Sequence, residues 1–147
     1  MSGQGADPYA PRPLAGWFYA AAIGSVLFML LGVLMYVQHV TLDPATLPVD
    51  QRAAFVAQPA WVTGAFAVTT WSGLAGAVLL ALRRRIGPTV LLVSLIALIV
   101  WIAGLALTGD VRASMSVNDW VVVIAVAALV WTIYWFGRHS LQRGWLR

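Results

Sequence analysis

Residues 88–107 read PTVLLVSLIALIVWIAGLAL, an apolar run without a single charge. A helix rises about 1.5 Å per residue, so a helix of this length measures about 30 Å, the thickness of the hydrocarbon core of a bilayer. Backbone polar groups in lipid must be hydrogen-bonded within their own segment, and a helix achieves this. Three further uncharged apolar runs occupy 14–37, 60–82 and 120–136. The sequence therefore predicts an all-α membrane protein, a four-transmembrane-helix bundle over residues 14–137.

The overall composition indicates the same class of protein. Of the 147 residues, 61% are hydrophobic and 10% are charged, whereas soluble proteins average roughly 45–50% and about 25%. The absence of cysteine excludes disulfide scaffolds, thiolate metal sites and thiol redox chemistry. Every basic side chain is Arg and every acidic one is Asp, a bias that we interpret as the codon usage of a GC-rich bacterial genome.

The distribution of arginine predicts the orientation in the membrane. Residues 1–13, the turn at 83–85 and the residues after Phe136 fall on one side, which then holds seven of the nine Arg and one of the five Asp. Cytoplasmic loops carry the excess of basic residues. We therefore predict a multi-pass protein of the bacterial inner membrane with both termini in the cytoplasm and an uncleaved first span. Residues 1–13 are then a disordered cytoplasmic N-terminus, and 138–147 a basic cytoplasmic tail.

The arginines on that side are candidates for fixing the topology or for binding lipid head groups. They include Arg83, Arg84, Arg85, Arg138 and Arg143. Topology is the interpretation we favour, because three arginines between two spans are what the predicted threading requires. The sequence pI is about 10.4, but the charges lie at helix ends rather than along one basic face. We therefore expect no nucleic-acid partner.

Small residues recur at helical spacing in the first two spans, where they would let helix backbones approach closely. The residues are Gly16, Ala20 and Gly24 in the first span, and Thr69, Ser72, Gly73 and Gly76 in the second. The pattern predicts that these two spans pack against each other. The alternative is a seam between copies of the chain.

The loop over residues 43–60 is the longest between predicted spans and carries signs of its own structure. Asp43-Pro44 and Leu47-Pro48 each resemble a helix start, and Pro59 suits the first turn of the next span. After them, an apolar set at helical spacing (Val49, Ala53 and Val56) lies opposite Asp50 and Arg52. This predicts a short amphipathic helix in the first extracytoplasmic loop, lying on the outer membrane surface or capping the bundle. Further on, Asn118 and Asp119 are predicted to cap the fourth helix.

Any binding function is predicted at this extracytoplasmic face. The candidate residues are His39, Asp43, Asp50, Arg52 and Phe55. A histidine near a carboxylate can transfer protons or bind a metal. Two alternatives remain: polar groups that simply mark the end of a span, and a lid that seals the bundle.

The sequence offers little for chemistry within the membrane. No span holds an ionisable residue at depth, and no Glu occurs, which argues against a proton-coupled exporter of the small multidrug type. His39 and His139 are predicted at opposite membrane faces, so they cannot share one haem iron. We therefore expect no enzyme activity, no metal site and no cofactor.

A scattered pattern resembles a known group of proteins. It comprises Leu47-Pro48, Arg52-Ala53, the run 59–63, the Arg turn, Ser94-Leu95-Ile96 and the ending Arg143-Gly144-Trp145-Leu146. This pattern is similar to a family of small bacterial four-span proteins that are mostly uncharacterised, some of them automatically labelled "sugar transporter". The resemblance implies a four-span fold and brings no catalytic or binding residue with it.

Two functions follow as hypotheses. The first is a non-catalytic accessory or interaction protein whose partners are the lipid bilayer and either another membrane protein or a second copy of itself. The second is a transporter or channel for a small solute such as a sugar, built by oligomerisation. The second needs a polar path, for which the spans offer only hydroxyls: Thr69, Thr70, Ser72 and Ser94.

Overall fold

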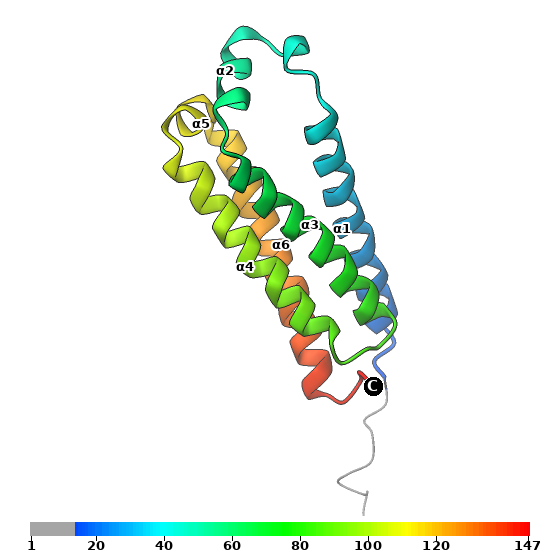
Figure 1. Cartoon of the computed structure of the whole chain (residues 1–147). Helices are drawn as coiled ribbons and strands as arrows, with labels where there is room; N and C mark the ends of the chain where they lie inside the picture. The colour runs from blue at the N-terminus through cyan, green and yellow to red at the C-terminus, as the bar shows by residue number, and fades with distance from the viewer. Residues whose placement is uncertain (1–13) are drawn as a thin grey trace, which may run out of the picture.

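The structure of the protein is a computed structural model that describes residues 14–147 except for the side chain of Asp50. The predicted N-terminal segment 1–13 lies outside the described residues. The described part folds into helices, shown in order in Figure 1. They are α1 (Phe18–Thr41), the 3-10 helix η1 (Pro44–Thr46), α2 (Val49–Ala57), α3 (Ala60–Ala81), α4 (Gly87–Leu107), α5 (Gly109–Ser114) and α6 (Val117–Gln142).

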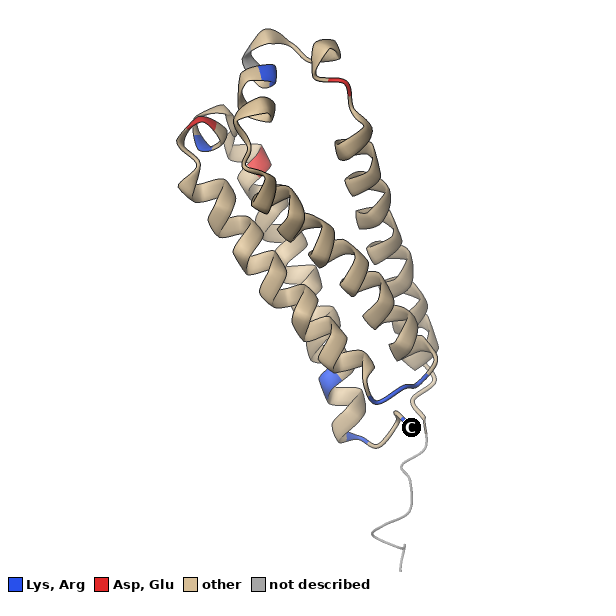
Figure 2. Ribbon diagram, viewed as in Figure 1, with Lys and Arg blue, Asp and Glu red and all other residues tan. Residues whose placement is uncertain are grey.

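Four of these helices, α1, α3, α4 and α6, are long and apolar enough to cross a membrane. For the described residues, this confirms the prediction of an all-α chain with four helices that are able to span a membrane. The charged residues of the described part lie at the two ends of the four-helix unit (Figure 2). One end, named the Arg end below, holds the turn between α3 and α4 with Arg83, Arg84 and Arg85, and the end of α6 with Arg138 and Arg143. The other, named the loop end, holds η1, α2 and α5.

The first helix differs from its prediction in both of its boundaries. α1 begins at Phe18 and continues to Thr41, past the predicted end at Val37. Gln38 and His39 end the apolar run, but both remain helical. The helix stops where Asp43 precedes Pro44, since a residue before proline is disfavoured in the helical region. Hydropathy therefore located the membrane-spanning part but not the end of the helix.

The fourth helix is longer than predicted at both ends. Its N-cap is Ser116, whose hydroxyl accepts from the backbone N–H of Asp119 while the Asp119 carboxylate accepts from the Ser116 N–H at 2.7 Å. The prediction that Asn118 and Asp119 cap this helix is corrected: Asp119 is the third residue of a capping box, and Ser116 is the cap. At the other end the helix runs to Gln142, so half of the predicted basic tail is helical.

Both α3 and α6 end in the same hydrogen-bond pattern. The residue after the C-cap has a positive φ, which is +59° at Arg83 and +70° at Gly144. The next residue donates its N–H to the carbonyl five positions earlier, at 2.8 Å in α3 and 3.0 Å in α6. This is a Schellman motif, in which glycine is the usual residue because a positive φ is costly for side chains with a Cβ. α6 follows the rule at Gly144, whereas α3 places an arginine there.

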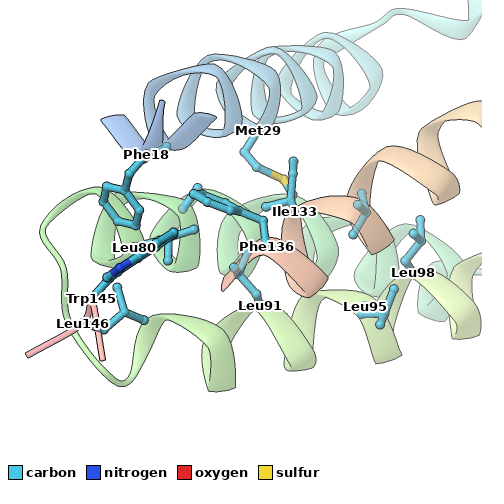
Figure 3. Close-up of a cluster of buried hydrophobic side chains, with 13 residues drawn as sticks. Phe18, Met29, Leu80, Leu91, Leu95, Leu98, Ile133, Phe136, Trp145 and Leu146 are labelled. Atoms are coloured by element: carbon cyan, nitrogen blue, oxygen red, sulfur yellow. The ribbon is translucent and has the colours of Figure 1, made fainter. Parts of the chain in front are cut away.

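The four long helices form an open set rather than a closed square. α3 packs extensively on α4 and on α1, and α6 packs mainly on α4. The two edges of the four-helix unit are therefore α1 and α6. The main core lies toward the Arg end, where side chains from all four helices and from the C-terminal residues meet (Figure 3). It includes Phe18, Leu80, Leu91, Phe136, Trp145 and Leu146. A smaller cluster near the loop end contains Val62, Leu105, Val111 and Val123.

Small residues on α3 make the close contacts of this core. A Cβ built on Gly73 would lie 2.7 Å from the Sδ of Met29 in α1. One built on Gly76 would lie 2.8 Å from the Cγ of Leu91 in α4. Thr69 is buried as well, and its carbonyl accepts the hydroxyl of Ser94 at 2.7 Å. Ser72 is half-buried and donates its hydroxyl to the carbonyl of Val68.

The predicted packing face of the first span is corrected by the structure. Gly16, Ala20 and Gly24 are exposed, and a Cβ on either glycine would meet nothing within 4 Å. α1 instead turns another stripe inward: Phe18, Ala22, Ser25, Met29 and Val33. This stripe is more apolar than the small-residue stripe, and Met29 fills the hollow left by Gly73. Large residues on α1 therefore fit against small ones on α3, where small-on-small packing was expected.

Candidate functional site

A pocket at the loop end gathers part of the predicted binding set. It has a volume of about 370 Å³ and lies between the end of α1, the η1 loop, α2 and the start of α3. Its lining residues are His39, Val40, Leu42, Pro44, Phe55, Gln58 and Thr63. The rings of His39 and Phe55 lie 4.9 Å apart at 53°. Two of the five predicted binding residues thus meet in one pocket.

The polar groups of the pocket are uncharged or weakly basic. Gln58 contributes an amide, Thr63 a hydroxyl and His39 an imidazole, and all three side chains are half-buried. Phe55 supplies an apolar ring face, and the imidazole ring also lies 6.2 Å from Phe66. A hollow with an aromatic wall and a few hydrogen-bonding groups suits an apolar or amide-containing side chain, or a small neutral molecule.

The charged residues near the pocket fold the loop that forms it. The Arg52 guanidinium donates from Nε to the carbonyl of Pro44 at 2.9 Å, and from one terminal nitrogen to that of Ala45 at 2.7 Å and that of Leu47 at 3.3 Å. The Asp43 carboxylate accepts from the backbone N–H of Ala45 at 2.9 Å and thereby caps η1. Both residues were predicted as binding groups, and the geometry gives both a structural role. The side chain of Asp50, the remaining candidate, is outside the described part.

The apolar stripe predicted on α2 faces away from the other helices. Val49 is 82% exposed and Val56 is 68% exposed, and Ala53 is exposed as well. The side of α2 that packs inward contains Phe55 instead. α2 also packs against α5, a helix of six residues that hydropathy did not predict. The loop end therefore presents an outward apolar surface beside a pocket.

The arginines of the Arg end divide into two groups. Arg83 and Arg85 bind the C-terminal residues: Arg83 donates from Nε to the Trp145 carbonyl at 2.8 Å, and Arg85 from Nε to the Leu146 carbonyl at 3.4 Å. The backbone N–H of Arg147 also donates to the Arg83 carbonyl, and that of Arg85 to the Arg147 carbonyl at 3.1 Å. We name this contact between 83–85 and 145–147 the clasp. By contrast, the predicted lipid-binding residues Arg84, Arg138 and Arg143 are exposed.

Sequence reasoning missed Gln58, Thr63 and the clasp. Nothing in the sequence distinguishes Gln58 and Thr63 from ordinary residues around a helix start. A signal for the clasp does exist, because two large apolar residues, Trp145 and Leu146, follow a glycine that ends a helix. They are 6% and 1% exposed. Trp145 lies edge-on to Phe18 at 5.9 Å and to Trp17 at 5.9 Å.

The two histidines lie at opposite ends of the four-helix unit, as predicted. His39 is part of the pocket at the loop end, while His139 stacks on Trp135 at 5.3 Å near the Arg end. Among the described residues, no three His, Asp or Glu side chains come together as a metal site would require. Compared with known proteins, the sequence matches no family model, no curated protein and no solved structure.

Proposed function

We propose that this chain is a non-catalytic accessory protein of the bacterial inner membrane that binds another membrane protein through its loop end. The observation that carries the proposal is the juxtaposition of the His39–Phe55 pocket with the outward Val49 and Val56 side chains of α2. A pocket next to exposed apolar residues is typical of protein interfaces, in which one side chain of the partner is anchored and neighbouring contacts exclude water.

The orientation is part of the proposal. The Arg end carries the excess of arginine, so the basic-residue rule places it in the cytoplasm and places the loop end outside. With the loop end outside, the partner contributes an exported loop or the outer end of a span.

The way in which the loop is built favours binding over a simple seal. A lid would use its apolar stripe to cover the helix ends, but Val49, Ala53 and Val56 point away from them. The hydrogen bonds of Arg52 and Asp43 hold the loop in one conformation without contribution from that stripe. The apolar stripe is thereby left free for another surface.

The alternative of a small-solute transporter has weaker support. The hydroxyls of Thr69 and Thr70 donate to carbonyls of their own helix, and that of Ser94 donates to α3. These donors are satisfied within the bundle, so they do not line a polar path. The resemblance to proteins labelled "sugar transporter" stays a prediction.

Site-specific photocrosslinking in cells tests the proposal. A photoreactive residue in place of Gln58, at the pocket, is expected to give one discrete protein adduct. The control replaces Val117, which is 80% exposed at the start of α6 and outside the pocket. Phe55→Ala is expected to abolish the Gln58 adduct and to leave membrane levels normal.

Two results would contradict the proposal. One is the same adduct from Gln58 and Val117, which would indicate random proximity. The other is an adduct unchanged by Phe55→Ala together with a lowered unfolding temperature in detergent, which would identify α2 as a lid.

A further inference from the structure

A groove between the two edge helices runs along the membrane-spanning part of the molecule. The half nearer the Arg end, named the lower groove below, has a volume of about 360 Å³. It is lined by residues of α1 and α6 and by the N-cap residue of α1. The wall residues are Trp17, Ala21, Gly24, Ser25, Phe28, Leu129, Thr132, Ile133, Trp135 and Phe136. A second hollow of about 240 Å³ continues toward the loop end and shares Phe28 with the first.

The lower half of the groove has the length of one leaflet. It extends along α1 from Trp17 to Phe28, which at about 1.5 Å per residue is roughly 16 Å, or half of a hydrocarbon core of about 30 Å. Trp17 and Trp135 stand at its Arg end and are 53% and 58% exposed. Tryptophan is enriched at this depth, where head groups meet acyl chains.

Apart from the indole N–H groups of Trp17 and Trp135 at its Arg end, the wall of the groove offers no free hydrogen-bond donor to a ligand. The Ser25 hydroxyl donates to the Ala21 carbonyl at 2.8 Å, and the Thr132 hydroxyl donates to the Ala128 carbonyl at 2.7 Å. Both donors are therefore satisfied by their own helices. Between those two rings and Phe28, the wall therefore suits a hydrocarbon, which leaves no polar group of its own unpaired.

We propose that the lower groove binds one acyl chain of an anionic phospholipid whose head group lies at the Arg end beside Arg138. Arg138 is exposed and follows Trp135, a residue of the groove wall, by three positions on α6, so it lies next to the groove and not in its wall. The described residues of this end carry arginines and no acidic side chain. A leaflet-length apolar wall thus ends at the basic end of the molecule, which is the complement of a phosphatidylglycerol molecule.

The size of the groove favours an acyl chain over a helix of another protein. A helix with its side chains is about 10–12 Å wide, so two turns of it occupy roughly 1,000 Å³. The lower groove holds about 360 Å³, and Phe136 in its wall packs on the buried Phe18 with the ring centres 5.5 Å apart. A single hydrocarbon chain fits this space, whereas a partner helix is too large to enter it and could insert only its side chains.

Native mass spectrometry with defined lipids tests the proposal. The full chain is purified in detergent and mixed with equal amounts of phosphatidylglycerol and phosphatidylcholine bearing the same chains. We expect one phosphatidylglycerol per chain to remain bound at collision energies that remove the other lipids. Gly24→Leu places a side chain into the groove and is expected to lower this occupancy at least tenfold.

The chain offers matched controls for both parts of the site. Gly64→Leu also adds a side chain where a Cβ meets nothing within 4 Å, but Gly64 is on α3 and outside the groove. It should leave the occupancy unchanged. Arg138→Gln is expected to reduce the preference for phosphatidylglycerol about fivefold, since a basic residue at an anionic surface contributes about 1 kcal/mol. Arg112→Gln, at the loop end, should leave that preference unchanged.

The outcomes decide between a lipid, a second copy and nonspecific detergent-like binding. Thr132→Phe fills the groove from α6 and must reproduce the effect of Gly24→Leu, which keeps the test valid if either variant misfolds. Equal occupancy in Gly24→Leu, Gly64→Leu and the unchanged chain would overturn the proposal. A dimer that is present in the unchanged chain and lost in Gly24→Leu would overturn it as well, in favour of a second copy in the groove.

Discussion

The Nε of Arg83 lies 2.8 Å from the carbonyl oxygen of Trp145, although 62 positions separate the two residues in the sequence. Each belongs to the Schellman motif that ends its helix, so the ends of α3 and α6 are bonded to each other. Arg83 adopts a φ of +59°, which glycine would adopt at lower cost. Its side chain has a function that glycine could not supply, since it holds the C-terminal residues over the core.

Arg83→Gln is expected to destabilise the fold, because it removes a charge-assisted hydrogen bond from a half-buried site. The expected loss is roughly 1.5–3 kcal/mol in the free energy of unfolding. The matched control is Arg84→Gln, which removes the same charge from the same turn but changes an exposed side chain. Equilibrium unfolding in detergent measures both. Equal effects of the two variants would show that charge alone matters in this turn.

Trp145→Ala should be among the most damaging single changes in the chain. The side chain is 6% exposed and contacts Trp17, Phe18 and His139. Truncating a buried tryptophan costs about 3–5 kcal/mol. Trp131→Ala removes an equally large ring that is 57% exposed, and a loss below about 1 kcal/mol is expected for it. The unfolding temperatures of the two variants provide the comparison, and a similar decrease in both would refute the clasp as a stabilising element.

Alanine substitution of two glycines should destabilise the fold at one position and not at the other. Gly76→Ala brings a Cβ to 2.8 Å from Leu91 Cγ and 3.0 Å from its backbone nitrogen, and such overpacking costs about 1–3 kcal/mol. At Gly24 a Cβ meets nothing within 4 Å, so Gly24→Ala is expected to be neutral or to stabilise α1 by up to about 1 kcal/mol. Destabilisation by Gly24→Ala in a monodisperse monomer would indicate a contact that the structure lacks.

Arg52→Ala should loosen the loop end without unfolding the helices. Its three hydrogen bonds to loop carbonyls link η1 to α2, and because the side chain is exposed their loss is expected to cost about 1 kcal/mol. Hydrogen–deuterium exchange should then accelerate over residues 44–57 and remain unchanged in α4. Arg112→Ala serves as the control, since Arg112 is an exposed arginine at the same end. Unchanged exchange in Arg52→Ala would mean that the loop is held by other contacts.

Cysteine labelling can establish the orientation, because the chain has no cysteine of its own. Gln142→Cys at the Arg end and Gln51→Cys at the loop end both replace exposed side chains. A membrane-impermeant maleimide added to intact spheroplasts is expected to label Gln51→Cys alone. Ser140 is unsuitable for this experiment because it is fully buried. Labelling of Gln142→Cys from outside would reverse the proposed orientation.

The four helices that are able to span a membrane could be predicted from the sequence because the signal is local. An uncharged run such as 88–107 has only one stable form in lipid, whatever its neighbours are. The inward face of α1 could not be predicted in this way. The spacing of Gly16, Ala20 and Gly24 describes one side of a helix, but the identity of the opposing surface depends on α3, where Gly73 leaves a hollow that Met29 fills.

The loop end shows the same limit for polar residues. The sequence marks Arg52 and Phe55 equally as candidates, since both are conspicuous in a long connection. Only the three-dimensional arrangement distinguishes their roles. Arg52 donates its hydrogen bonds to carbonyls of the preceding turn, whereas Phe55 faces His39. Helix ends were misjudged for a related reason: capping by Ser116 and termination at Gly144 depend on backbone hydrogen bonds rather than on hydropathy.

The clasp also sets an order of events during biosynthesis. The turn at Arg83 leaves the ribosome well before its partner Trp145, which is added 62 residues later. At about 5–20 residues per second, this interval lasts roughly 3–12 s. During that time α1, α3 and α4 can enter the membrane, but the floor of the core around Phe18 stays uncovered. The side chains that Trp145 and Leu146 cover in the finished fold are therefore exposed for an interval of seconds during synthesis.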